Sequence, residues 1–191
     1  MSLHNLTQVL SFSNFINEAK KDVHEYGCVM IYVDMPDEIK EIHKEIPKSD
    51  IYTETGDREF GLEKESHITL LYGVHGGVTS KEITDLLADI DFTEMSVNNL
   101  SIFKSENCEV LKFDVKSKAL IKANNILCKN VPFTNDHPKY MPHLTVGYLK
   151  KGSSKELIKK YKGTSFNIKP SKIVYSTPDG KVKTITKFNE E

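Results

Sequence analysis

The chain has 191 residues, of which 38% are hydrophobic and 28% are charged, and its formal net charge at pH 7 is −1. These values are typical of a globular protein that buries a substantial core, and they exclude a disordered chain. The small net charge also disfavours duplex DNA as a partner, because domains that bind duplexes are usually clearly basic.

The first half of the chain is predicted to alternate helices and strands, on the basis of hydrophobic periods of 3.6 and 2 residues. Glycine and proline residues mark the expected ends of these elements. The expected elements are an amphipathic helix over 11–26, a strand over 28–33, a short helix over 39–46, a polar loop over 52–64, a strand that begins at 67, and a helix that begins with a capping box at 79–82.

The second half is predicted to contain more strands. Its last two strands flank a Pro-Asp-Gly turn at 178–180, which is a strong hairpin signal. The expected elements are strands over 96–103 and 109–115, a helix over 117–129, a loop over 130–141, a strand that begins at 143, a lysine-rich helix that begins near 153 and ends near 163, and strands over 172–177 and 182–188.

Two of these strands carry nearly the same motif. Residues 66–73 read Ser-His-Ile-Thr-Leu-Leu-Tyr-Gly, and residues 142–149 read Pro-His-Leu-Thr-Val-Gly-Tyr-Leu. Residues i and i+2 of a strand point to the same face, so His67 lies beside Thr69, and His143 beside Thr145. None of the other five histidines has this spacing and context. The alternative is that both histidines are ordinary half-buried strand residues satisfied by their neighbours.

The tyrosines of the two motifs, Tyr72 and Tyr148, stand five residues after each histidine. An odd offset places them on the opposite face of a regular strand, so we expect them to pack in the core.

Each half of the chain contributes strands and helices around one His-x-Thr strand. We therefore predict an α+β protein with two pseudo-symmetric lobes, each an antiparallel sheet with helices outside, and with the His-x-Thr strands lining a central cleft. The lobes are expected to interleave along a single domain of residues 1–191. The oligomeric state is left open.

Charge is divided unevenly between the two halves. Residues 1–100 carry a net charge of −11, and residues 101–191 carry +10. The basic half either supplies a field for an anionic ligand or complements the acidic half, within the chain or across an oligomer.

The two motifs together contain the groups needed for phosphoryl transfer. One neutral imidazole can accept a proton from the attacking oxygen, and one protonated imidazole can donate a proton to the leaving oxygen. The hydroxyl groups of Thr69 and Thr145 can donate hydrogen bonds to the non-bridging phosphoryl oxygens. The sequence does not indicate which histidine is the acid.

Other kinds of chemistry lack their sequence signals. There is no P-loop, no Gly-x-Ser-x-Gly, no His-Glu-x-x-His and no dinucleotide-binding glycine motif. Cys28, Cys108 and Cys128 are odd in number and scattered, which disfavours disulfides and a zinc site. We expect no metal and no cofactor. No apolar run is long enough to span a membrane and the N-terminus lacks a signal layout, so we expect a cytoplasmic protein.

The paired His-x-Thr strands resemble the two-histidine (2H) phosphoesterase superfamily, and the resemblance extends from 28–33 to the 175–180 hairpin. The Gly-Leu-Glu sequence at 61–63, together with 66–73 and 139–152, is similar to the bacteriophage anti-CBASS phosphodiesterases. Those enzymes destroy the cyclic oligonucleotide messengers of bacterial immunity. The resemblance implies catalytic roles for His67, Thr69, His143 and Thr145.

The resemblance also implies metal-independent cleavage of a 3′–5′ linkage in a cyclic di- or trinucleotide, with the ribose 2′-hydroxyl as nucleophile. The host bacterial cytoplasm would be its location. Tyr32 matches the aromatic residue that stacks a base in this family, and the alternative is a tyrosine packed at a strand edge. The chain has no Trp, so Phe103 and Tyr140 are the candidates for a second stacking residue. The alternatives are an RNA-end 2′,3′-cyclic phosphodiesterase and a non-catalytic sponge for cyclic nucleotides.

Overall fold

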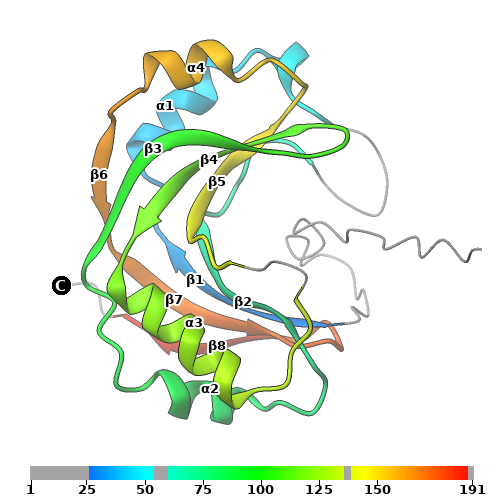
Figure 1. Ribbon diagram of the computed structural model, residues 1–191, viewed down its shortest axis with the longest axis vertical. Helices are drawn as coiled ribbons and strands as arrows, with labels where there is room; N and C mark the ends of the chain where they lie inside the picture. Colours follow the sequence, from blue (N-terminus) through cyan, green and yellow to red (C-terminus); the bar gives the residue numbers. More distant parts are fainter. Residues whose placement is uncertain (1–25, 54–59, 136–138, 189–191) are drawn as a thin grey trace, which may run out of the picture.

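The computed structural model describes residues 26–53, 60–135 and 139–188, whose strands form two four-stranded antiparallel sheets (Figure 1). The helix predicted over 11–26 lies outside these residues, apart from its last position. The expected α+β fold with two antiparallel sheets is confirmed. Sheet A has the order β2 (His67–Val74), β1 (Gly27–Val33), β7 (Pro170–Ser176), β8 (Val182–Lys187), and sheet B the order β5 (His143–Leu149), β4 (Glu109–Lys116), β3 (Met95–Lys104), β6 (Ser165–Ile168).

The helices lie outside the sheets, and two of them cross to the sheet that does not precede them in the chain (Figure 1). The helix α1 follows β1 of sheet A but contacts β5 of sheet B, and α3 follows β4 of sheet B but contacts β2 of sheet A. No helix of the described residues is long and apolar enough to cross a membrane. The helices are α1 (Asp37–Glu45), the 3₁₀ helix η2 (Lys48–Asp50), α2 (Ser80–Leu87), α3 (Lys118–Asn130) and α4 (Lys155–Lys160).

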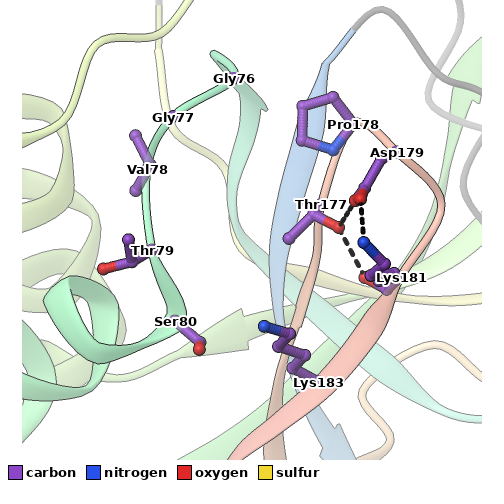
Figure 2. A pocket seen from close by; sticks show the side chains of 10 residues that line it. All are labelled: Gly76, Gly77, Val78, Thr79, Ser80, Thr177, Pro178, Asp179, Lys181 and Lys183. Atoms are coloured by element: carbon purple, nitrogen blue, oxygen red, sulfur yellow. Dashed lines mark hydrogen bonds and ion pairs between the residues drawn. The ribbon is translucent and has the colours of Figure 1, made fainter.

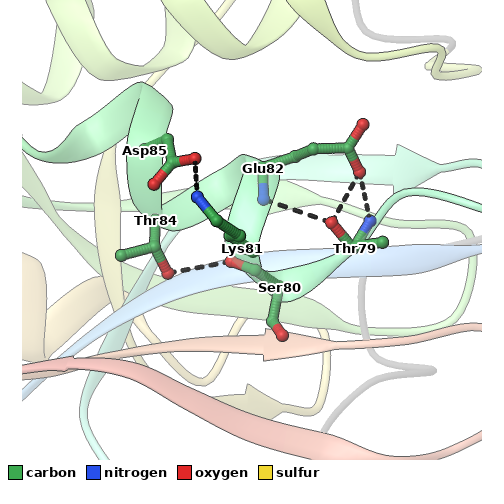
Figure 3. A network of polar contacts seen from close by, with 6 residues as sticks. All are labelled: Thr79, Ser80, Lys81, Glu82, Thr84 and Asp85. Carbon is green, nitrogen blue, oxygen red and sulfur yellow. Dashed lines mark hydrogen bonds and ion pairs between the residues drawn. The ribbon is translucent and has the colours of Figure 1, made fainter.

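The predicted capping box begins α2 (Figure 3). The Thr79 hydroxyl accepts a hydrogen bond from the Glu82 backbone N–H at 3.2 Å, and the Glu82 carboxylate accepts one from the Thr79 N–H at 2.7 Å. Two backbone donors that lack partners within the helix are thereby satisfied. The other predicted elements that lie within the described residues also form, whereas the short strand β6 was not anticipated.

Strand β1 shows how the two faces of sheet A differ. Val29, Ile31 and Val33 belong to the main hydrophobic core, which includes residues of both sheets. Cys28, Met30 and Tyr32 point to the opposite face and form a separate cluster. We call the face that carries Tyr32 and its neighbour His67 the inner face of sheet A.

Both motif strands contain a β-bulge just after the threonine. In β2, Thr69 lies opposite Met30 but Tyr72 lies opposite Cys28, so three steps on β2 match two on β1. The extra residue reverses the alternation of side chains. Tyr72 therefore packs on the inner-face cluster, on the same face as His67. The prediction that Tyr72 faces away from its histidine was wrong.

Strand β5 repeats this irregularity. Thr145 lies opposite Lys112 and Gly147 lies opposite Leu111, so Val146 is the additional residue. Tyr148 consequently returns to the face of Thr145, so its predicted face was wrong for the same reason. Its predicted burial is confirmed, because Tyr148 is 7% exposed.

A helix side chain satisfies the backbone carbonyl of each bulge. The Asn124 side chain of α3 donates a 2.7 Å hydrogen bond to the Leu70 carbonyl, and the His43 Nε2–H of α1 donates one of the same length to the Val146 carbonyl. A buried carbonyl without a partner would cost about 1–3 kcal/mol, and the Val146 carbonyl accepts a second hydrogen bond, from the Glu63 N–H at 3.0 Å. These crossing helices therefore stabilise the bulges that set the orientation of the motif strands.

Gly73, near the end of β2, allows another segment to approach the strand closely. Its φ is 85°, and a Cβ atom would lie 1.7 Å from the Thr134 carbonyl oxygen. The Thr134 N–H also donates to the Gly73 carbonyl at 2.9 Å. We expect Gly73→Ala to lower the free energy of unfolding by about 3 kcal/mol or more, as measured by denaturant unfolding.

Gly76 provides the matched control, because no atom would lie within 4 Å of its Cβ. Gly76→Ala should change the stability by less than about 1 kcal/mol. Equal stability of the two variants would contradict the close approach of the chain at Gly73.

Candidate active site

The two His-x-Thr pairs lie on strands that meet. β2 and β5 are edge strands of their sheets, and they contact each other. His67, Thr69 and Thr145 are buried, and His143 is half-buried. The segment before β2 also runs along β5, since the Glu63 N–H donates to the Val146 carbonyl at 3.0 Å. The structure thus brings the four side chains selected from the sequence to one junction between the sheets.

Both imidazoles are anchored in the same way. His67 Nδ1 lies 3.0 Å from the Glu65 carbonyl oxygen, and His143 Nδ1 lies 2.8 Å from the Met141 carbonyl oxygen. A carbonyl oxygen can only accept, so Nδ1 carries a proton in each ring. Nε2 is therefore the nitrogen of each ring that accepts a proton when the ring is neutral and donates one when it is charged.

The surroundings of His143 favour its neutral form. Burial lowers the pKa of His143 to about 4, and the positive charges of Lys112 and His67 act in the same direction. The hydrogen bond to the Met141 carbonyl opposes this shift. An imidazole that is neutral at pH 7 can act as a general base through Nε2.

Glu63 is a site residue that the sequence reasoning assigned no role. Its side chain is buried, and its carboxylate accepts hydrogen bonds from the backbone N–H groups of Lys64 at 3.2 Å and Glu65 at 3.5 Å. Burial raises the pKa of Glu63, and the attraction of His67 partly offsets that rise. The carboxylate therefore interacts favourably with a positive charge on His67.

Lys112 is a second site residue that was missed. It lies opposite Thr145 in the β4–β5 ladder, is 5% exposed, and pairs with the carboxylate of Asp114. Asp114 lies opposite His143 and also accepts a 2.6 Å hydrogen bond from Asn99. The only sequence signal was the alternation of charged and apolar residues along 109–116.

The aromatic residues Tyr32 and Phe103 occupy comparable positions on the two sheets. The Tyr32 ring lies 5.6 Å from the His67 ring, and the Phe103 ring lies 4.9 Å from the His143 ring, measured between centroids. A lysine ammonium group lies over each ring, Lys172 over Tyr32 at 4.6 Å and Lys112 over Phe103 at 4.4 Å. Each lobe therefore places a histidine, an aromatic ring and a lysine together.

Tyr140 contacts the site through the backbone of β2. Its hydroxyl donates a 2.9 Å hydrogen bond to the Thr69 carbonyl oxygen, and burial raises the pKa of this hydroxyl. The ring packs against the main core. This geometry fits a residue that holds Thr69 in position, and base stacking by Tyr140 stays a prediction.

The described residues contain no group of three or more His, Cys, Asp or Glu side chains that could hold a metal ion. A hollow of about 380 Å³ lies elsewhere, between the start of α2 and the β7–β8 turn (Figure 2). Its walls include Thr79, Asp179 and Lys183, and none of the four motif residues lines it.

No protein-family model matches the sequence, and no curated protein is similar enough to count as a match. Among solved structures, Usb1 from Kluyveromyces marxianus shares 11% identity, with 85% of this chain and 98% of Usb1 covered and a TM-score of 0.53. The same protein with uridine monophosphate gives 11% identity, coverage of 84% and 98%, and a TM-score of 0.49.

LigT from E. coli, complexed with 3′-AMP, gives 16% identity, coverage of 86% and 97%, and a TM-score of 0.44. The likeness to Usb1 shows that this chain has the fold of that protein over most of its length.

Proposed function

We propose that this protein is a 2H phosphoesterase, and that it cleaves a 3′–5′ linkage of cyclic di- or trinucleotide messengers in the cytoplasm of an infected bacterial cell. One observation supports the enzyme class above all others. Two histidines from strands 76 positions apart in the sequence carry the same Nδ1 anchor and meet at one junction between the sheets.

The proposed reaction begins with His143 as the general base. Its neutral Nε2 accepts the proton of the ribose 2′-hydroxyl, whose oxygen forms a bond to phosphorus. The phosphorus–O5′ bond breaks, and protonated His67 donates its Nε2 proton to the departing O5′. The products are a 2′,3′-cyclic phosphate end and a free 5′-hydroxyl. Such acid and base steps typically each contribute 10²–10⁴ in rate.

The environment of His143 supports this division of roles. Burial and the nearby positive charges disfavour a proton on His143, which suits it to the role of base and leaves the role of acid to His67. Thr69 and Thr145 would donate hydrogen bonds to the non-bridging oxygens as charge develops there. No metal ion is required, because protonated His67 supplies the acid and the hydroxyls stabilise the phosphoryl oxygens.

The cyclic-nucleotide substrate is proposed from the sequence features at 61–73 and 139–152, which are similar to the anti-CBASS phosphodiesterases. The net charge of +10 on residues 101–191 also suits a ligand that carries several phosphates.

A turnover assay in EDTA tests this function. The protein is incubated with cyclic GMP-AMP, and separately with an RNA that ends in a 2′,3′-cyclic phosphate, and the products are separated by chromatography. We expect linear products from cyclic GMP-AMP without any added metal. Turnover of the RNA ends alone would indicate the RNA-processing alternative. A ligand that is bound but recovered intact would indicate a sponge, and loss of activity in EDTA would contradict the metal-independent mechanism.

A further inference from the structure

Four residues lie in a row across the inner face of sheet A. In the strand ladders, Tyr32 lies opposite His67 on one side and opposite Lys172 on the other, and Lys172 lies opposite Lys187. Residues that oppose each other in antiparallel strands project to the same face. The row therefore leads from the candidate acid, across one aromatic ring, to two lysines.

The Tyr32 ring separates the imidazole from the first ammonium group. The Lys172 Nζ lies 4.6 Å from the ring centroid, and the His67 ring lies 5.6 Å from it. Neighbouring strands are 4.7–4.9 Å apart, so the backbones of His67 and Lys172 are separated by about 10 Å. His67 and Lys172 therefore reach the Tyr32 ring from the two strands that flank β1, which allows a ligand group at Lys172 to be distinct from the phosphate at the histidines.

The two lysines lack a compensating negative charge among the residues that the structure describes. No carboxylate within those residues lies within 4 Å of the ammonium group of Lys172 or Lys187. Lys112 in the other lobe differs, because it pairs with Asp114. Like charges directly opposite each other in a sheet repel, and a bound anion would relieve that repulsion.

We propose that Lys172 and Lys187 form a binding site for a second phosphate group of the substrate, one nucleoside away from the scissile phosphate. Tyr32 then contacts the nucleoside between the two phosphates. This proposal rests on the proposed function and specifies its substrate class as a nucleotide with at least two phosphodiester groups. A nucleoside with a single phosphate occupies only the part of the site at the histidines.

Calorimetric binding tests the second phosphate site independently of turnover. The probes are a phosphorothioate analogue of cyclic GMP-AMP, which has two phosphate positions, and adenosine 3′-phosphate, which has one. We expect Lys172→Gln to raise the Kd of the cyclic probe about tenfold or more, because a charge-assisted hydrogen bond is lost. The Kd of the monophosphate should change less than about twofold, because its single phosphate binds elsewhere. Binding of the cyclic probe should also become less sensitive to salt.

Lys183→Gln is the control, because it removes the same charge from β8 at a residue opposite Tyr175, whose ring belongs to the main core. This variant should bind both probes as the wild type does. The proposal is overturned if Lys172→Gln weakens the binding of both probes equally or weakens neither. It is also overturned if Lys183→Gln weakens the binding of the cyclic probe as much as Lys172→Gln does, or if the wild type binds the cyclic probe no more tightly than the monophosphate. A wild type that binds the cyclic probe through Lys172 but leaves cyclic GMP-AMP uncut would contradict only the proposed catalysis.

Discussion

His143→Ala and His67→Ala are each expected to lower kcat for cyclic GMP-AMP by about 10³-fold, because general acid or base catalysis typically contributes 10²–10⁴ in rate. The two variants should retain much of the affinity for the ligand, since the lysines and aromatic rings around the histidines remain. Single-turnover rates and calorimetric binding measure these two effects separately.

His75→Ala is the matched control, because His75 bonds to Thr134 at 2.8 Å and is neither of the motif histidines. Its kcat should equal that of the wild type. Circular dichroism and thermal melting show whether each variant is folded. A folded His143→Ala or His67→Ala protein with a near-normal rate would contradict the acid and base roles.

In a plot of kcat/KM against pH, the fall in rate on the acidic side (the acidic limb) should occur well below pH 6.5, the ordinary pKa of histidine. With the pKa of His143 at about 4 instead of 6.5, about nine-tenths of the protein holds neutral His143 at pH 5, against roughly 3% for an ordinary histidine. We therefore expect kcat/KM to remain nearly constant from pH 7 to pH 5 as far as the base is concerned. Below pH 4 it should fall tenfold per pH unit. A limb centred near pH 6.5 would contradict the environment described for His143.

Two variants test the cause of this behaviour. Lys112→Gln removes a positive charge that lowers the pKa of His143, so the acidic limb should move to higher pH.

His143→Gln should affect stability instead. The depressed pKa means that the unfolded chain binds a proton that the folded protein refuses, so the wild type loses stability as the pH falls from 6.5 towards 4. The His143→Gln variant should not show this part of the stability loss. Denaturant unfolding at a series of pH values measures the difference.

Much of the fold could be predicted from the sequence because its signals are local. The apolar run at 28–33 and the hairpin turn at 178–180 each indicate their structure within a few residues. Strand β6 was missed because Ser165–Ile168 has four residues, too few to show a period. The faces of Tyr72 and Tyr148 were wrong because nothing in the sequence marks a bulge, which depends on the partner strand.

The candidate site was only partly visible in the sequence. The spacing of His67 and Thr69, repeated at His143 and Thr145, could be recognised because the two residues of a pair lie on the same strand. Lys112 acquires its place through its register with Thr145, 33 positions later, and such a pairing has no local signature. Glu63 could not be recognised in the sequence because it is one of several acidic residues in a polar segment. Only the structure shows that it is buried and interacts with His67.

The exchange of helices between the lobes makes each histidine depend on the opposite half of the polypeptide. The carbonyl of Leu70, which follows the first pair, is held by Asn124 from later in the chain, and that of Val146, which follows the second, is held by His43 from earlier. Neither half supplies every support for its own imidazole. Assembly of the proposed catalytic centre is consequently tied to completion of the whole tertiary structure, so a partly folded molecule would lack the pair of histidines that we propose as acid and base.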